Sequence, residues 1–252
     1  MEKLVFILFI GLYASVFSDS KHVTKPEIEK KEIVITKEIS KVDSLYQSMN
    51  LKNVVNYKAF KEAMEGYTLL PAKNKDVLSI IDFTLASTEK RLVVLDLKNE
   101  KVLYHSVVSH GKNSGSNFAT SFSNRPESYQ SSLGFYITEN TYQGANGYSL
   151  VLNGLDKGFN DKAKSRAVVI HGADYANPSV VGSLGRLGRS YGCPALPRAL
   201  NKPIINTIKD GTLLYIYADD EEYLAKSKVL NQRNELMAHY QKDMADKFGT
   251  LN

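Results

Sequence analysis

The order of hydrophobic and polar residues divides the start of the chain into an apolar segment, a polar leader and a helical stretch. Residues 4–16 are almost wholly apolar, whereas residues 19–38 are polar, rich in lysine and glutamate, and contain Pro26. Apolar residues then recur at roughly helical spacing between residues 40 and 67. We therefore predict two helical pieces in that stretch, the second of which ends at Gly66.

The pattern changes near Pro71 to short runs of β-branched and aromatic residues, which are typical of strands. The predicted strands span residues 77–85, 91–97, 102–109, 133–138, 148–152, 166–171 and 212–217. Lys98-Asn99-Glu100-Lys101 joins the second strand to the third and predicts a hairpin. Because long helices do not alternate regularly with these strands, we predict a mainly β fold, with a barrel or sandwich core and flanking helices at both ends.

Two further helices are predicted towards the C-terminus. The first covers residues 195–208, where Pro197 is compatible with a first helical turn. The second is a long charged helix over residues 221–248, with a loose apolar stripe that either packs on the domain or binds a partner. The predicted organisation is a signal peptide at 1–20, a polar and helical extension at 21–69, a strand-rich domain at 70–218 and a C-terminal helix at 219–252.

The first twenty residues have the composition of an export signal. Lys3 supplies the positive charge, residues 4–16 the apolar segment, and residues 16–20 the small-residue cleavage geometry. The apolar segment is shorter than the about 20 residues that a membrane span needs, and an uncleaved N-terminal anchor is the alternative. We expect export to the periplasm or the cell envelope. Since no second long apolar segment follows, we expect no stable membrane insertion after signal removal.

Composition narrows the range of partners. With 252 residues, 43% of them hydrophobic, the chain is long enough for one sizeable core plus extensions. The formal net charge of +5 allows attraction to a polyanionic surface, and solvated lysines are the simpler interpretation. The sequence has no glycine-rich phosphate loop and no nucleic-acid motif, so nucleic acid is not an expected partner. It has no His/Asp/Glu cluster with the spacing of metal ligands, so we expect no metal. We also expect no other cofactor, and a monomer.

Cys193 is the only cysteine in a chain that begins like an exported protein. A lone cysteine is an inert buried thiol, an intermolecular linker or a reactive nucleophile. Its neighbours favour the nucleophile, because Gly192 permits a close approach that a side chain would block. The amides of Gly192 and Cys193 are then candidate donors to the oxygen of an attacked carbonyl group. A helix beginning at Cys193 would in addition lower the pKa of the thiol through its dipole.

His171 is the best candidate for the base that such a cysteine needs. It ends the apolar run 167–170, so we expect it at a strand end, and Gly172 after it allows a sharp turn. His110, which also precedes a glycine after a strand-like run, is the rival base and otherwise lines the pocket. The stretch 113–132 is either a substrate loop or an ordinary surface loop.

Four motifs surround these residues. They are His171-Gly172, Gly188-Arg189-Ser190-Tyr191-Gly192-Cys193-Pro194-Ala195, His110-Gly111-Lys112-Asn113-Ser114-Gly115 and Ser121-Phe122-Ser123-Asn124. Together they resemble the murein L,D-transpeptidase catalytic domain family, over roughly residues 77–218. The chain departs from the main family at Tyr191, where a second histidine is usual, and at Pro194, where Asn or Arg often follows the cysteine. A subgroup with Gly-Arg-Ser-aromatic-Gly-Cys-Pro-Ala resembles the chain in both places.

The resemblance implies an L,D-transpeptidase-like fold and an enzyme that acts on peptidoglycan stem peptides. Cys193 would attack a stem peptide at the carbonyl before its terminal D-alanine, with His171 as base. The acyl group would then pass to an amine of a neighbouring stem as a 3→3 cross-link. Water as acceptor would make the protein an L,D-carboxypeptidase, and a non-catalytic cell-wall-binding protein is the alternative from another class.

The resemblance also implies roles for the residues around the nucleophile. Ser190 would orient His171 or the loop, and Tyr191 would line the pocket. Arg186 and Arg189 would pair with carboxylates of the stem peptide. For Arg189, a structural ion pair is the alternative.

Overall fold

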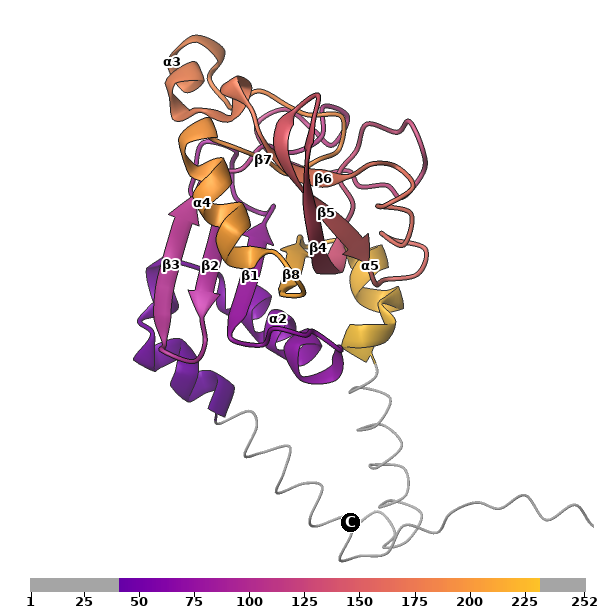
Figure 1. The fold of residues 1–252 in the computed structure, drawn as a ribbon. Helices are drawn as coiled ribbons and strands as arrows, with labels where there is room; N and C mark the ends of the chain where they lie inside the picture. The colour runs from indigo at the N-terminus through magenta and orange to yellow at the C-terminus, as the bar shows by residue number, and fades with distance from the viewer. Residues whose placement is uncertain (1–40, 232–252) are drawn as a thin grey trace, which may run out of the picture. The chain divides into compact units, whose positions relative to one another are not determined.

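The computed structural model describes residues 41–231 (Figure 1). The chain divides into two compact units, residues 1–37 and residues 38–252, and all described residues belong to the second. The predicted signal peptide at 1–20 lies outside the described residues and stays a prediction.

Within residues 41–231, eight strands form one mixed sheet. They are β1 (Val77–Asp82), β2 (Leu92–Asp96), β3 (Lys101–Ser106), β4 (Gly134–Gly144), β5 (Gly147–Gly154), β6 (Val169–Gly172), β7 (Ala195–Leu196) and β8 (Leu213–Tyr217). Their order across the sheet is β3-β2-β1-β8-β4-β5-β6-β7. The β1–β8 and β6–β7 pairs are parallel and the other pairs are antiparallel. All the predicted strands are present, and the hairpin between β2 and β3 is confirmed.

The neighbouring strands β1 and β8, near the middle of the sheet, are almost wholly buried. Every residue of β8 is buried, and β1 is buried except for its first residue. Such runs of β-branched, leucine and aromatic residues suit a position that is covered on both faces. The edge strand β3 begins with three exposed residues. The core therefore lies around β1 and β8.

The sheet curls so that the chain leaving one edge meets the strand at the other edge. Ser109, after β3, pairs with Ala195 of β7, and Gly111 pairs with Ser190. Since β3 and β7 are the two ends of the strand order, these bridges link the two edges. The predicted mainly β core with flanking helices is confirmed, as one curled sheet rather than a two-sheet sandwich.

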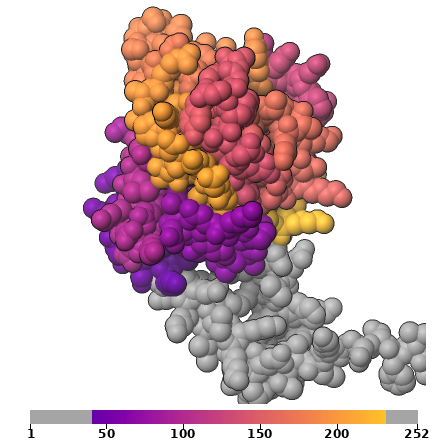
Figure 2. Space-filling model, viewed as in Figure 1, coloured from indigo at the N-terminus to yellow at the C-terminus, as the bar shows by residue number. Residues whose placement is uncertain are grey.

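Helices lie against the sheet and beside its edges. They are residues 41–48, η1 (Leu51–Asn53), α2 (Tyr57–Leu69), η2 (Asp174–Ala176), η3 (Pro178–Val180), α3 (Val181–Leu184), α4 (Arg198–Ile208), α5 (Glu221–Lys226) and residues 228–231. α2 packs on β1 and β8, and α4 packs on β1, β5 and β6. Figure 2 shows α4, in orange, on the face towards the viewer. In the part of the chain described, no helix has both the length and the apolar content to cross a membrane.

α2 continues through Gly66 to Leu69, so the prediction that Gly66 ends this helix is wrong. The glycine serves packing instead of termination. A Cβ added at Gly66 would lie only 2.1 Å from the ring of Phe135 in β4. Gly66 therefore lets the helix approach the sheet closely.

Two helix predictions near the C-terminus also need correction. Residues 195–196 form β7, so the helix predicted from residue 195 begins only at Arg198. The helix predicted over residues 221–248 starts as expected but is interrupted, because α5 ends at Lys226 and helical residues resume only at 228–231. At this break Ser227 is extended, and its hydroxyl donates to the buried Asp156 at 3.0 Å. Residues from 232 onwards lie outside the described residues.

Candidate active site

Hydrogen bonds fix the turn that precedes Cys193. The backbone of Ser190 pairs with the segment 110–112 through bonds of 2.9 and 2.8 Å. The buried Ser190 hydroxyl accepts the Gly192 N–H at 3.0 Å and donates to the Cys193 carbonyl oxygen at 2.6 Å. Ser190 was predicted to orient either His171 or the loop. In the described structure its hydroxyl orients the loop and makes no hydrogen bond to His171.

Gly192 is required by backbone conformation and by space. Its φ is +125°, and an added Cβ would lie 2.9 Å from the carbonyl oxygen of Gln130. Its N–H is bound to Ser190, so the prediction that it faces the attacked carbonyl oxygen does not hold here. The N–H of Cys193, in contrast, has no hydrogen-bond partner among residues 41–231.

The Cys193 sulfur is half-buried against the start of β6. It accepts a hydrogen bond from the Val169 N–H at 3.4 Å, and its thiol donates to the Ala167 carbonyl oxygen at 3.7 Å. Ala167 has a φ of +54° because it closes a helical turn in which the Val168 N–H reaches the Ala163 carbonyl at 2.9 Å. This turn places both partners of the sulfur.

The β6–β7 ladder brings His171 beside the nucleophile turn. His171 pairs with Ala195, and its backbone N–H donates to the Pro194 carbonyl at 3.4 Å. The ring Nδ1 lies 3.3 Å from the Gly172 carbonyl oxygen, which can only accept a hydrogen bond. Nδ1 is therefore the protonated nitrogen and the lone pair of Nε2 is left for a base. No direct hydrogen bond joins this ring to the Cys193 sulfur in the described structure.

Gly172 is required by packing rather than by the sharp turn that we predicted. It lies in β6, and an added Cβ would be 2.9 Å from the Cβ of Asn201 in α4. Asn201 is anchored in turn, because its Nδ2 donates to the Tyr148 carbonyl oxygen at 2.8 Å. α4 therefore packs closely against Gly172, the residue whose carbonyl oxygen orients the His171 ring.

Burial raises the pKa of the Cys193 thiol. The Val169 N–H and the charge of Arg166 act in the opposite direction without cancelling the effect of burial. β7 follows the cysteine, so the predicted helix dipole does not lower this pKa. The resting thiol is therefore protonated at neutral pH and needs a base to react.

The environment of His171 suits that base. Burial lowers the pKa of His171, the Gly172 carbonyl opposes this shift, and the charge of Arg198 adds to it. The side chain is only 4% exposed, so bulk water does not restore the usual value. His171 is consequently neutral at pH 7 and able to accept a proton.

Arg166 is a functional candidate that the sequence did not reveal. Its guanidinium donates four hydrogen bonds to the loop 123–132. The acceptors are Ser123 O, Ser132 Oγ, Ser128 Oγ and Gln130 O, at 2.8, 2.5, 3.1 and 2.9 Å. Its Nη2 lies 3.5 Å from the place of a Cβ on Gly192, and no described ion pair neutralises its charge. Arg166 thus places an uncompensated positive charge against the nucleophile turn.

His110, the rival base, is bound at both ring nitrogens. Nδ1 lies 2.8 Å from Nη2 of Arg91, and Nε2 lies 3.5 Å from the Gly115 carbonyl oxygen. Burial, followed by the charge of Arg91, lowers the pKa of His110 to about 4. The side chain is 1% exposed. His110 therefore has no free lone pair and does not line a substrate pocket, which corrects both predictions for it.

The two arginines expected to bind carboxylates donate to the backbone. Arg189 Nη1 reaches two carbonyl oxygens of the segment 112–115, at 3.0 and 2.8 Å, so this group braces the loop and forms no ion pair in the described structure. Arg186 is half-buried and donates to the Leu187 carbonyl at 2.7 Å, so its contact with substrate stays a prediction. Tyr191 is 69% exposed, in agreement with a residue at the surface of the site.

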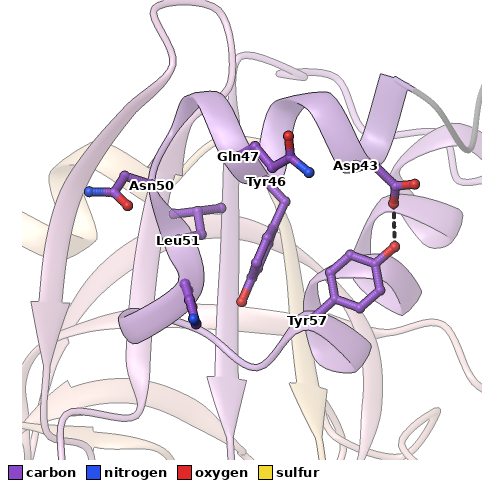
Figure 3. Close-up of a pocket in the computed structure, with 7 residues that line it drawn as sticks. Asp43, Tyr46, Gln47, Asn50, Leu51 and Tyr57 are labelled. Atoms are coloured by element: carbon purple, nitrogen blue, oxygen red, sulfur yellow. Dashed lines mark hydrogen bonds between the residues drawn. The ribbon is translucent and has the colours of Figure 1, made fainter.

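A pocket of about 450 Å³ lies in the N-terminal helical extension (Figure 3). Its lining consists of Asp43, Tyr46, Gln47, Asn50, Leu51, Lys52 and Tyr57. The Tyr57 hydroxyl donates to Asp43, and the Tyr46 hydroxyl donates to the Val55 carbonyl at 2.8 Å. The pocket contains none of the predicted site residues. Between residues 41 and 231, no three His, Cys, Asp or Glu side chains lie close enough to hold a metal ion.

The half-buried Cys193 thiol lies two residues before β7, and the buried, neutral His171 imidazole lies in the neighbouring strand β6, an arrangement compatible with a cysteine nucleophile and its base. The L,D-transpeptidase catalytic domain family matches residues 51–217, which include both groups and the whole sheet. The chain belongs to the L,D-transpeptidase catalytic domain family. Curated protein sequences contain no match to the chain.

Solved structures of L,D-transpeptidases are similar to the chain at low sequence identity. One from Mycobacterium smegmatis has 16% identity and a TM-score of 0.35, over 57% of this chain and 59% of that chain. One from Mycobacterium tuberculosis H37Rv has 16% identity and a TM-score of 0.34, over 57% and 58%. One from Xylanimonas cellulosilytica has 14% identity and a TM-score of 0.33, over 58% and 63%. The chain thus covers less than two thirds of each of these structures.

Proposed function

We propose that the protein is a peptidoglycan L,D-transpeptidase that forms 3→3 cross-links through a Cys193 acyl-enzyme. The pairing of β6 with β7 carries this proposal, because it sets the neutral His171 beside the turn that holds the thiol. Family membership supports peptidoglycan stem peptides as the substrate class.

In the first half-reaction, Nε2 of His171 accepts the thiol proton and the Cys193 sulfur attacks the carbonyl carbon before the terminal D-alanine. The Cys193 side chain must first rotate away from the Ala167 carbonyl oxygen, to which the resting thiol donates a hydrogen bond. The C–N bond then breaks. The proton passes from His171 to the amine of the departing D-alanine, and a thioester on Cys193 remains.

In the second half-reaction, an amine of a neighbouring stem attacks the thioester. His171 accepts the proton of that amine, a new amide bond forms, and the sulfur leaves as a thiolate that recovers the proton. The N–H of Cys193 is the donor assigned to the developing oxyanion in both halves, because the described structure gives it no other partner.

We further propose that residues 1–20 direct export and that the protein acts in the periplasm or at the cell envelope. The positive start and the short apolar segment support this proposal.

The decisive experiment is incubation of the purified protein with a disaccharide-tetrapeptide, followed by mass analysis of the products. Cross-linked dimers are the expected result. Tripeptides without dimers would indicate an L,D-carboxypeptidase that uses the same two residues. Unchanged substrate in the presence of folded protein would contradict catalysis and favour a wall-binding protein.

The same assay tests the nucleophile. Cys193→Ser should abolish turnover while leaving the fold intact, because a hydroxyl is a far weaker nucleophile than a thiolate. A carbapenem should add covalently to the parent protein, as intact mass would show, and Cys193→Ala should remove the adduct. Substantial turnover by folded Cys193→Ser protein would rule out this mechanism.

A further inference from the structure

Lys112 is a cation beside the nucleophile turn that the proposed mechanism leaves unused. Its Nζ lies 4.4 Å from the centre of the Tyr129 ring and 4.5 Å from that of the Tyr191 ring. The two ring centres are 4.9 Å apart, with the planes inclined at 50°. The two rings therefore hold the ammonium group by cation–π attraction. We call these three residues the Lys112 clamp.

The backbone ties the Lys112 clamp to the loop that carries the nucleophile. The Lys112 N–H donates to the Ser190 carbonyl at 2.8 Å, and Tyr191 follows Ser190 directly, two residues before Cys193. Tyr129 sits in a left-handed conformation, with a φ of +54°. The Tyr129 carbonyl oxygen accepts the Asn113 N–H at 3.2 Å, so backbone hydrogen bonds connect all three residues of the clamp to the loop that carries Cys193.

The ammonium group of Lys112 is available to a ligand. It has three N–H donors, and ring faces satisfy its charge without offering an ordinary hydrogen-bond acceptor. Neither an ion pair nor a hydrogen bond from its Nζ occurs within residues 41–231. The Lys112 side chain is half-buried and its neighbour Tyr191 is exposed, so the donors can reach a solute. Arg189, in contrast, already donates to two carbonyl oxygens.

Tyr175 links the Lys112 clamp to the reacting sulfur. Burial raises the pKa of Tyr175 to about 12, and electrostatic interactions with the ionisable side chains of Cys193 and Tyr191 raise it further. One phenol is therefore within electrostatic range of both the nucleophile and a member of the clamp. Its backbone accepts the Gly188 N–H at 2.7 Å, which holds it against the same loop.

We propose that the Lys112 clamp binds a free carboxylate of the donor stem peptide and thereby favours acidic stems over amidated ones. This inference rests on the proposed function for the substrate class. A carboxylate can accept charge-assisted hydrogen bonds from the ammonium group, whereas a neutral amide offers only one weaker acceptor. The rings keep the lysine in place, so little rotational freedom is lost when the carboxylate binds.

The test compares two synthetic tetrapeptides that end in D-alanine, one with free carboxylates and one with the same carboxylates amidated. Calorimetry on the Cys193→Ala protein gives both dissociation constants without turnover. The free acid should bind about tenfold more tightly, the scale of a hydrogen bond to a charged group. Lys112→Gln should remove this preference. Tyr191→Phe, which keeps the ring, should retain it, and Tyr191→Leu should reduce it.

Lys101→Gln is the matched control, because it removes the same charge from an exposed lysine at the start of β3 and should leave the preference unchanged. Equal binding of the two peptides, no binding of either, or a preference that survives Lys112→Gln would overturn the inference. Failure of the proposed function has a different signature. The protein with intact Cys193 would then convert neither peptide, whatever the calorimetry shows.

Discussion

At the scale of single residues, the environment decides which histidine can act as a base. His171 and His110 both follow strand-like runs and precede glycine. His171 donates from one nitrogen and keeps the other lone pair, whereas His110 is engaged by Arg91 on one side and Gly115 on the other. Both are neutral at pH 7, but only His171 can accept a proton without breaking a hydrogen bond.

This difference predicts the effect of removing each ring. His171→Ala should lower the rate of Cys193 acylation by roughly 10²-fold or more, the usual contribution of a general base. His110→Ala should lower the acylation rate of the folded protein much less. Intact mass after timed exposure to a carbapenem at pH 7 measures both rates. A normal acylation rate in His171→Ala, together with no detectable acylation in folded His110→Ala, would show that the base is misassigned.

Arg166 gives a second prediction at this scale. Arg166→Gln removes the charge that opposes burial at Cys193, so the pKa of the thiol should rise further above its ordinary value. Arg166→Lys retains the charge and should keep the pKa closer to that of the parent. The pH dependence of alkylation by iodoacetamide reports this pKa. An equal rise in both variants would point to disturbed loop packing instead of a lost charge.

Cys193 and His171 could be named as candidates from the sequence, because each carries a distinctive reactive group in a specific motif. Arg166 and Lys112 were not, since lysine and arginine are common and most are only solvated. Their significance comes from partners far away in the sequence, such as loop 123–132 for Arg166 and Tyr191 for Lys112. The same reason explains Arg189, whose acceptors are brought near it only by the bridge between Gly111 and Ser190.

At the scale of elements, the strands were predictable and the local reasons for helix ends were not. β8 and β1 are apolar runs whose burial follows from their composition. β7 has two residues and exists only because β6 pairs with it, so no periodicity could reveal it. Gly66 reads as a helix end when its neighbour Phe135 is not known.

Gly66 therefore provides a test in which packing opposes intrinsic propensity. Alanine favours a helix interior by up to about 1 kcal/mol over glycine, yet its Cβ would overlap the Phe135 ring. We expect Gly66→Ala to reduce the free energy of unfolding by about 1–3 kcal/mol, the usual cost of overpacking. Gly182→Ala in α3 is the control, because nothing lies within 4 Å of the added methyl group. Urea unfolding of both variants measures the difference, and an unchanged Gly66→Ala would contradict the packing account.

At the scale of the whole molecule, folding buries histidines in their neutral form. Burial lowers the pKa of His105, His110 and His171, most strongly at His110. His110 lies against Arg91 and the Phe83 ring, with Arg189 adding a further positive charge. Protonation of His110 would place two cations in contact in the interior, so acid should weaken the fold as a whole.

The effect of His110 on stability depends on pH through the difference between its unfolded and folded pKa values. Unfolded His110 binds a proton near pH 6.5 and the folded protein only near pH 4, so its contribution to stability is complete above about pH 6.5 and is lost as pH falls towards 4. Between pH 7 and pH 5 the loss is about 2 kcal/mol. The buried carboxyl groups of Asp82 and Asp156 have raised pKa values and act in the opposite direction, so the parent alone does not isolate His110.

Comparison with His110→Asn isolates the contribution of His110 to the pH dependence of stability. The variant has no group at position 110 that can be protonated, while the buried carboxyl groups remain. The variant should be less stable than the parent at pH 7, since it loses contacts with Arg91 and Phe83. Its stability should nevertheless fall by about 2 kcal/mol less between pH 7 and pH 5. Denaturant unfolding at the two pH values gives the four free energies. Parallel losses in parent and variant would mean that His110 keeps an ordinary pKa and that the buried network does not hold it neutral.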